Sequence, residues 1–447
     1  MEQKRSNFTG KIGFVLAAAG SAVGLGNIWR FPYLAAQYGG GIFLLVYIIL
    51  ALTFGFTLMT AEIALGRMTG QSAIGAFRKL NKKYTFVGIL ASIIPAIILP
   101  YYSVIGGWVT KYLTVFVSGG MEKAAGDGFF SAFTGQTVEP IVYFAIFIGL
   151  TALVVLLGVE KGIEKVSKIM MPVLVILTVF IAFYGMFMPG AMEGVLYYIT
   201  PDISKFSVTT VLAAMGQLFY SMSLAMGIMI TYGSYMKKDV NIESSVHSIE
   251  IFDTGIAFFA GLMIIPAVVA SGGDLGKGPG LMFITLPKVF ASMPGGAIIG
   301  SLFFLLVLFA ALTSSISLME TVVSILKDKF NWNRKVICCI VLLFSVLLGL
   351  PSSLGFGALK NVTPLNMDIL TFFDFISNSV LMPIVALLTC IFIGYVIKPK
   401  AICDEVEVSG KFKSKKLFTI IIKYIAPICI LLILGFSVLE GLGFIKV

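Results

Sequence analysis

Several oxygen-bearing side chains stand in stretches of this sequence that are otherwise apolar enough to cross a bilayer. Asn27, Ser221 and Asp253 lie in three such stretches, and Thr313 and Ser314 follow each other in a fourth. Carboxylate, amide and hydroxyl oxygens, without sulfur or imidazole, favour a hard cation such as Na⁺ over a transition metal. An ionisable group at membrane depth is itself a candidate for function. The alternative for the hydroxyls is that they bond back to carbonyls of their own helix.

Two of the apolar stretches carry glycine and polar residues at their middle. The first reads GSAVGLGNIWRFPY from Gly20, and the sixth reads GQLFYSMSLAMGIMITY from Gly216. Glycine tolerates backbone conformations that interrupt a helix, and interrupted backbone in a membrane must face protein or a cavity. We therefore expect the first and sixth spans to be unwound around a shared internal site. The alternative is that these glycines serve only close helix packing.

Membrane-spanning helices must position these residues. The chain has 447 residues, 58% of them hydrophobic and 12% charged, and a mean hydropathy of +1.00. Apolar runs of about 18 residues or more can cross a bilayer as helices. We predict an all-α integral membrane protein with eleven transmembrane helices. They are expected near 9–37, 39–69, 85–118, 139–158, 163–188, 205–236, 241–271, 296–326, 334–350, 369–397 and 416–441.

The charged residues indicate topology rather than nucleic-acid binding. Lys and Arg concentrate in every second loop, which places the N-terminus in the cytoplasm and, for an odd number of spans, the C-terminus outside. We expect the cell inner (plasma) membrane. The single histidine and five cysteines have no metal-ligand spacing, and no phosphate-binding glycine loop is present, so an enzyme is not expected.

Four motifs, in order and spacing, resemble the neurotransmitter:sodium symporter family, particularly its bacterial amino-acid transporters. They read AAAGSAVGLGNIWRFPYLAAQYGGGIFLLVY, TYGSYMKKD, FITLPKVF and LTSSIS, and the resemblance covers nearly the whole chain. It implies two inverted repeats of five helices with unwound first and sixth helices. The repeats would be 1–188, with the N-terminal tail, and 189–398, followed in 399–447 by an inner loop and one further helix. Most members have twelve spans.

The resemblance also implies two sodium sites. The first would be completed by the carboxylate of the substrate, which couples ion and substrate binding, whereas the second needs no substrate atoms. Asp253 departs from the neutral residue of chloride-dependent members, so its charge is expected to replace chloride; the alternative is a structural hydrogen-bonding role. The first site would use Ala22, Asn27, Ser221 and Asp253, and the second Gly20, Val23, Ala310, Thr313 and Ser314.

A substrate pocket is implied next to these sites. Gly24 lies where biogenic-amine carriers of the family have an aspartate, which leaves room for an α-amino acid that brings its own carboxylate. The mostly apolar pocket residues favour a hydrophobic or aromatic side chain. The matching positions are Ala22, Gly24, Leu25, Gly26, Ile98, Tyr102, Tyr220, Ser221, Ser223, Met226 and Leu318.

Two charge pairs resemble the gates of the family. Arg30 with Asp374 would close the outer side, although Asp368 is a rival for the acidic position, and Arg5 with Asp328 would close the inner side. Judged by spacing alone, each is an ordinary surface or snorkelling charge.

Glu62, in the second span, is expected to support the site by accepting hydrogen bonds from amides released by the sixth helix; the alternative is a proton-carrying role. The resulting hypothesis is Na⁺-coupled, chloride-independent symport of an α-amino acid by alternating access, with no obligate protein partner evident. The alternative is a Na⁺-independent antiporter or a proton-coupled carrier of the same architecture.

Overall fold

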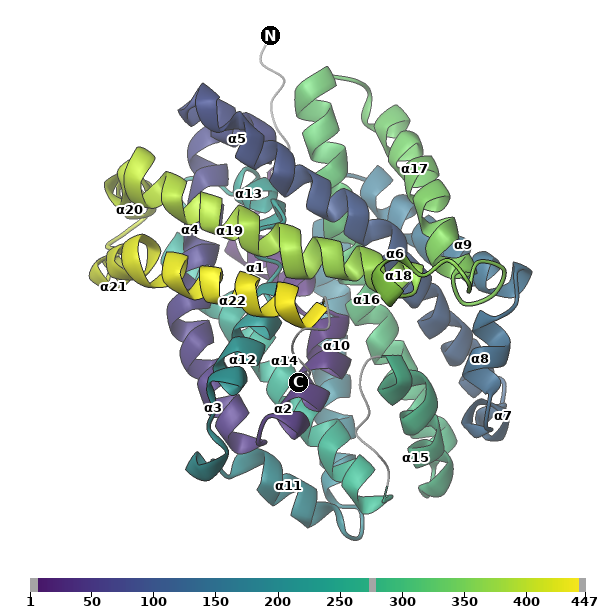
Figure 1. The fold of residues 1–447 in the computed structure, drawn as a ribbon. Coiled ribbons are helices and arrows are strands. Elements are labelled where there is room, and N and C mark those ends of the chain that lie inside the picture. Colours follow the sequence, from purple (N-terminus) through teal and green to yellow (C-terminus); the bar gives the residue numbers. More distant parts are fainter. Residues whose placement is uncertain (1–6, 273–278, 442–447) are drawn as a thin grey trace.

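The structure is a computed structural model that describes residues 7–272 and 279–441. Within these ranges the fold is all-helical, with 83% helix and one isolated β-bridge between Gly40 and Pro201. Figure 1 shows long helices crossing one another at several angles, with short helices at both ends of the bundle. An all-helical fold satisfies every backbone group within its own segment, as a bilayer requires.

The long apolar helices match the predicted spans. Among the described residues, nine helices are long and apolar enough to cross a membrane, and one bent pair would make a tenth. They are Gly41–Thr69 (α3, η2 and α4), Lys82–Val117 (η3 and α6), Val138–Leu156 (α9), Val159–Met186 (η4 and α10), Ile242–Ala270 (α14), Gly296–Phe330 (α16), Arg334–Leu354 (α17), Ile369–Val396 (α18, η8, α19 and η9) and Lys415–Leu439 (α21, η10 and most of α22).

The first predicted span is broken where its glycines lie. Its two halves are α1 (Lys11–Ala22) and the segment Gly26–Gln37, which comprises η1 and α2, and they meet at an angle of 53°. Residues 23 and 24 between them have no helical conformation. The predicted interruption of the first span is therefore present.

The sixth predicted span is also divided. It consists of α12 (Val208–Ser221) and α13 (Ile228–Gly233), each too short to cross a bilayer alone. Between them, Ser223 and Ala225 have positive φ values of 53° and 62°, which side-chain-bearing residues rarely adopt. Backbone strain of this kind persists only where the surroundings enforce it, and it gathers at functional sites. This division explains why an eleventh long helix is missing from the described residues.

The short helix α13 is held in the interior by close packing. It lies against α4 (Phe56–Thr69), where a Cβ added to Gly66 would lie 1.9 Å from the Ile230 carbonyl oxygen. Because no side chain fits there, glycine at this position allows the two backbones to touch. The half-helix after the second break is thus fixed in place.

The C-terminal part packs outside this arrangement. In Figure 1, α22 (Ala426–Gly441) runs beside α19 (Met382–Ile391). The segment predicted as an inner loop contains a helix, α20 (Lys398–Glu407), which is tied to the end of α4. The tie is an ion pair of 2.7 Å between Arg67 Nε and Glu405 Oε1, with both side chains buried.

Candidate functional site

A cavity lies between the two helix breaks, with about 350 Å³ of space that atoms do not fill. The cavity is also lined by four residues that the sequence did not assign to the substrate pocket: Ser21, Ile228, Ser314 and Ser317. The structure thus brings together every residue predicted to contact substrate, although their binding role stays a prediction. Those residues are Ala22, Gly24, Leu25, Gly26, Ile98, Tyr102, Tyr220, Ser221, Ser223, Met226 and Leu318.

Backbone groups at the first break end at this cavity. The Leu25 amide donates to the Tyr102 hydroxyl at 3.3 Å, and the Gly26 carbonyl accepts from Gln217 Nε2 at 2.9 Å. A Cβ at Gly24 would lie 2.6 Å from Ser314 Oγ, so a side chain there would displace neighbouring groups. The break is therefore held open by polar contacts from α6 (Thr85–Val117) and α12.

One wall of the cavity is a cluster of serine hydroxyls. Ser21 Oγ lies 2.7 Å from Ser317 Oγ, and Ser223 Oγ donates to the Ser21 carbonyl at 2.9 Å. All three side chains are buried. The cavity is consequently polar on this side and apolar around Ile98 and Leu318.

Two of the predicted ligands of the first sodium site, Asn27 and Ser221, contact a third, Asp253, which is fully buried in α14. Its Oδ1 accepts from Asn27 Nδ2 at 2.7 Å and from Ser221 Oγ at 2.6 Å. Its Oδ2 accepts from the Tyr47 hydroxyl at 2.9 Å. None of these described partners carries a positive charge. A buried carboxylate surrounded only by neutral donors favours a bound cation.

Of the predicted ligands of the second sodium site, the carbonyl oxygens of Gly20 and Val23 contact Ser314 in α16. The Ser314 hydroxyl lies 3.5 Å from the Gly20 carbonyl oxygen and 3.3 Å from that of Val23, two oxygens predicted to bind sodium. Its shortest contact with a carbonyl oxygen is to that of Ser21, at 3.2 Å. The Thr313 hydroxyl donates to the Ala310 carbonyl at 3.1 Å. These oxygens at the start of the first break therefore face the middle of α16, and no carboxylate belongs to the set.

Besides four residues of the cavity lining, sequence reasoning missed two residues that contact the site from outside the cavity. Tyr47 lies in an apolar run of the second span and carries no local sign of its contact with Asp253. Gln217 did carry one, because an amide side chain at membrane depth beside the sixth break is unusual. The glutamine could therefore have been found from the sequence, and the tyrosine could not.

The predicted outer gate residues are near each other but not paired. Arg30 and Asp374 line one cavity, with about 900 Å³ of unfilled space, and the Arg30 guanidinium lies 5.2 Å from the Tyr220 ring centroid. No ion pair joins Arg30 and Asp374 in the part of the chain that the structure describes. Asp374 Oδ1 instead accepts from the Tyr101 hydroxyl at 3.1 Å and from Asn378 Nδ2 at 2.5 Å.

The rival acidic residue has a different role. Asp368 Oδ1 accepts from the Thr371 amide at 2.9 Å and so caps the N-terminus of α18 (Ile369–Asp374). Asp374 lines the same cavity as Arg30 and Asp368 does not, so Asp374 stays the predicted acidic residue of the outer gate.

The predicted inner gate can be described in part. Asp328 Oδ2 accepts from the Ser72 amide at 2.8 Å, whereas Arg5, its predicted partner, lies outside the described residues.

Glu62 Oε1 accepts from the Ala225 amide at 2.7 Å, within the second break. This is the kind of contact expected of a supporting carboxylate.

A cavity bordered by two interrupted helices, within a bundle of apolar helices, is the arrangement in which membrane transporters bind small solutes. The chain belongs to the sodium:neurotransmitter symporter family, whose model matches residues 5–122 and 134–442. It is therefore a sodium-dependent transporter and not an enzyme.

Similar proteins extend over nearly the whole chain. An uncharacterized sodium-dependent transporter of Bacillus subtilis, YhdH, is 35% identical over 97% of both chains. The crystal structure of MhsT in complex with L-phenylalanine superposes with a TM-score of 0.88 at 39% identity, covering 97% of this chain and 99% of that one. The sodium- and chloride-dependent taurine transporter of Rattus norvegicus is 27% identical over 90% of this chain and 73% of its own.

Proposed function

We propose that this protein imports a hydrophobic or aromatic α-amino acid with Na⁺ and without chloride. One observation carries the proposal: Ser221 lines the cavity and also donates a hydrogen bond of 2.6 Å to Asp253. An ion held between Asp253 and Ser221 would lie at the edge of the cavity. A carboxylate in the cavity could then become a further ligand of the same ion, which would couple the two bindings.

The cavity wall supports an α-amino acid as the substrate. The Leu25 and Gly26 amides and the Tyr102 hydroxyl would bind its carboxylate, and carbonyls near Ala22 and Tyr220 would bind its ammonium group. Apolar liners such as Ile98, Met226 and Leu318 would surround the side chain. The L-phenylalanine named in the MhsT structure supports the same class of substrate.

Asp253 carries the proposal that chloride is not needed. A fixed carboxylate beside the first sodium set supplies the negative charge that an anion would otherwise provide. Ala257, one turn further along α14, is fully buried and offers no hydroxyl to an anion. The taurine transporter, which is sodium- and chloride-dependent by name, therefore makes a useful comparison for transport assays.

Transport is proposed to follow alternating access between an outer gate at Arg30 and Asp374 and an inner gate at Arg5 and Asp328. The proposal includes eleven spans in the cell inner membrane, with the N-terminus in the cytoplasm and the C-terminus outside. The helices would form inverted repeats in 1–188 and 189–398, with the helix in 399–447 outside them. Two sodium ions per cycle are proposed, one for each oxygen set.

Uptake into proteoliposomes tests the function. Labelled amino acids are offered under separate inward gradients of Na⁺, K⁺ or H⁺, and with chloride replaced by gluconate. We expect uptake that only the Na⁺ gradient drives, unchanged without chloride and saturable by one class of amino acid. Uptake driven by H⁺ or by amino-acid exchange without Na⁺ would overturn the symport proposal in favour of the antiporter or proton-coupled carrier.

A further inference from the structure

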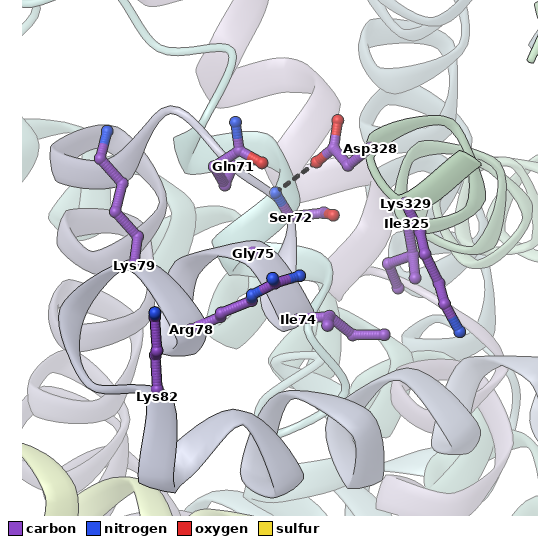
Figure 2. Close-up of a pocket in the computed structure, with 10 residues that line it drawn as sticks. All are labelled: Gln71, Ser72, Ile74, Gly75, Arg78, Lys79, Lys82, Ile325, Asp328 and Lys329. Atoms are coloured by element: carbon purple, nitrogen blue, oxygen red, sulfur yellow. Dashed lines mark hydrogen bonds between the residues drawn. The ribbon is translucent and has the colours of Figure 1, made fainter. Parts of the chain in front are cut away.

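A basic cavity at one end of the bundle is separate from the ligand cavity and the sodium sets. Figure 2 shows it between α5 (Ala73–Leu80) and the end of α16, and it has about 910 Å³ of unfilled space. Arg78, Lys79, Lys82 and Lys329 line it, and Asp328 is the one carboxylate of its described lining. Its net charge therefore attracts an anion.

Two of the four cations are available to a ligand. In the described residues, the side chains of Arg78 and Lys82 make no ion pair or hydrogen bond. Lys79 Nζ donates to a backbone carbonyl at 2.9 Å, and Lys329 Nζ lies 5.0 Å from the Phe330 ring centroid. Asp328 is directed at the Ser72 amide, 2.8 Å away. In Figure 2, the Arg78 guanidinium extends beneath Gly75 towards the middle of the cavity.

Ser72 provides an independent sign of a ligand. It lines the cavity and is fully buried, and its hydroxyl has no hydrogen-bond partner in the described structure. Figure 2 shows this hydroxyl directed to the side of the cavity formed by Ile325 and Lys329. Buried hydroxyls are nearly always partnered, and an oxygen of a ligand in the cavity would supply the acceptor that this one lacks.

We propose that this cavity binds a phosphate group. A guanidinium binds phosphate through two parallel hydrogen bonds, and an ammonium group adds a point charge, which is the combination that Arg78 and Lys82 offer. Such a group can come from the headgroup of an anionic phospholipid or from free phosphate. The headgroup is favoured because α5 buries Ala76 and Phe77 and leaves its basic residues exposed, as expected at an anionic membrane surface.

Native mass spectrometry of the full-length protein in detergent tests the site. The protein is mixed with phosphatidylglycerol or with phosphatidylcholine, and bound lipid is counted for the wild type and for Arg78→Ala/Lys82→Ala. The matched control is Lys335→Ala/Lys400→Ala, which removes two exposed charges that do not line the cavity. Ser72→Ala removes the free hydroxyl without changing the charge of the cavity. It tests the site if Arg78→Ala/Lys82→Ala does not fold.

We expect phosphatidylglycerol binding to fall about tenfold in Arg78→Ala/Lys82→Ala and by a smaller factor in Ser72→Ala, with the control like the wild type. A second arm measures the melting temperature with inorganic phosphate against chloride at equal ionic strength. In one outcome, inorganic phosphate raises the melting temperature of the wild type but not of the cavity variants, while lipid binding is the same in all of them. That result would support the site and identify free phosphate as its ligand. If neither measurement separates the cavity variants from the control, the proposal is wrong.

Discussion

The two oxygen sets predicted to bind sodium differ in charge and in the helices that supply them. The first gathers on Asp253 and joins the break of α1 to α12 and α3 through Asn27, Ser221 and Tyr47. In the second set, the Ser314 hydroxyl of α16 contacts backbone carbonyl oxygens of the same break. One set thus holds a fixed negative charge, and the other is neutral.

This difference suggests different tasks for the two sodium ions proposed above. A carboxylate in a buried, neutral environment gains most from a bound cation, so the first set should dominate charge balance. A neutral set between α1 and α16 can respond to a small movement of those helices, because carbonyl positions decide its geometry. The first set should therefore govern substrate coupling, and the second should govern how these helices pack.

Among the variants considered, Asp253→Asn should weaken Na⁺-dependent substrate binding most. Neutralising the buried charge that faces the ion costs about 3 kcal/mol or more, so we expect the Na⁺ concentration for half-maximal substrate binding to rise at least about 100-fold. Scintillation proximity binding of the labelled substrate against Na⁺ measures it.

Glu250→Gln is the control for Asp253→Asn. Glu250 is a buried carboxylate on the same helix, but it contacts His247 at 3.0 Å and lines neither set. It should change the Na⁺ dependence by less than about threefold. Equal losses in both variants would show that Asp253 has no special role in binding the ion.

Ser314→Ala should have the second largest effect. Loss of one hydroxyl ligand costs about 1.4 kcal/mol, so Na⁺ affinity should fall about tenfold. Ser314 lines the ligand cavity, but its hydroxyl is not among the proposed substrate contacts, so substrate affinity at saturating Na⁺ should stay the same. Isothermal titration with substrate at several Na⁺ concentrations separates the two effects.

Ser315→Ala is the matched control, because the neighbouring serine is also buried but contacts Thr151 Oγ1 at 3.0 Å, away from the carbonyl oxygens. It should behave as the wild type. A loss of substrate affinity in Ser314→Ala that saturating Na⁺ does not restore would contradict the division of tasks.

Glu62→Leu tests whether a residue outside both oxygen sets affects Na⁺ binding at the first set. It leaves the Ala225 amide of the second break without its acceptor, 2.7 Å away in the wild type, and should perturb Ser221 four residues earlier. An unsatisfied buried amide costs about 1–3 kcal/mol. If about 1 kcal/mol of this cost appears as a distortion of the first set, Na⁺-dependent substrate binding should weaken about fivefold.

The conservative variant Glu62→Gln keeps an acceptor oxygen and should restore binding. Transport that falls in Glu62→Gln as far as in Glu62→Leu would instead favour a proton-carrying role for this residue.

The sequence predicted the parts of the site that local motifs encode. Glycines and hydroxyls at membrane depth located both breaks, and the family motifs identified the residues that the structure gathers around one cavity. The contact between Tyr47 and Asp253 joins residues 206 positions apart, and its existence depends on how α3 (Gly41–Leu50) packs against α14. Spacing carries no signal for such a contact. The unpaired outer gate likewise depends on the conformation, not on residue identity.

Tyr47→Phe should have the smallest effect, and it tests whether the tyrosine belongs to the first set. Its hydroxyl donates to Asp253 Oδ2 at 2.9 Å, and loss of one such bond to a carboxylate that keeps two other donors costs about 0.5–1 kcal/mol. Na⁺ affinity should therefore fall about twofold to fivefold, measured by the same binding assay as Asp253→Asn. Tyr112→Phe, which removes a buried bond of 2.7 Å to the Phe283 carbonyl, is the control for a lost tyrosine hydroxyl elsewhere. In a double variant with Asp253→Asn, the Tyr47→Phe effect should vanish, because the tyrosine acts on the ion only through the charge that it orients.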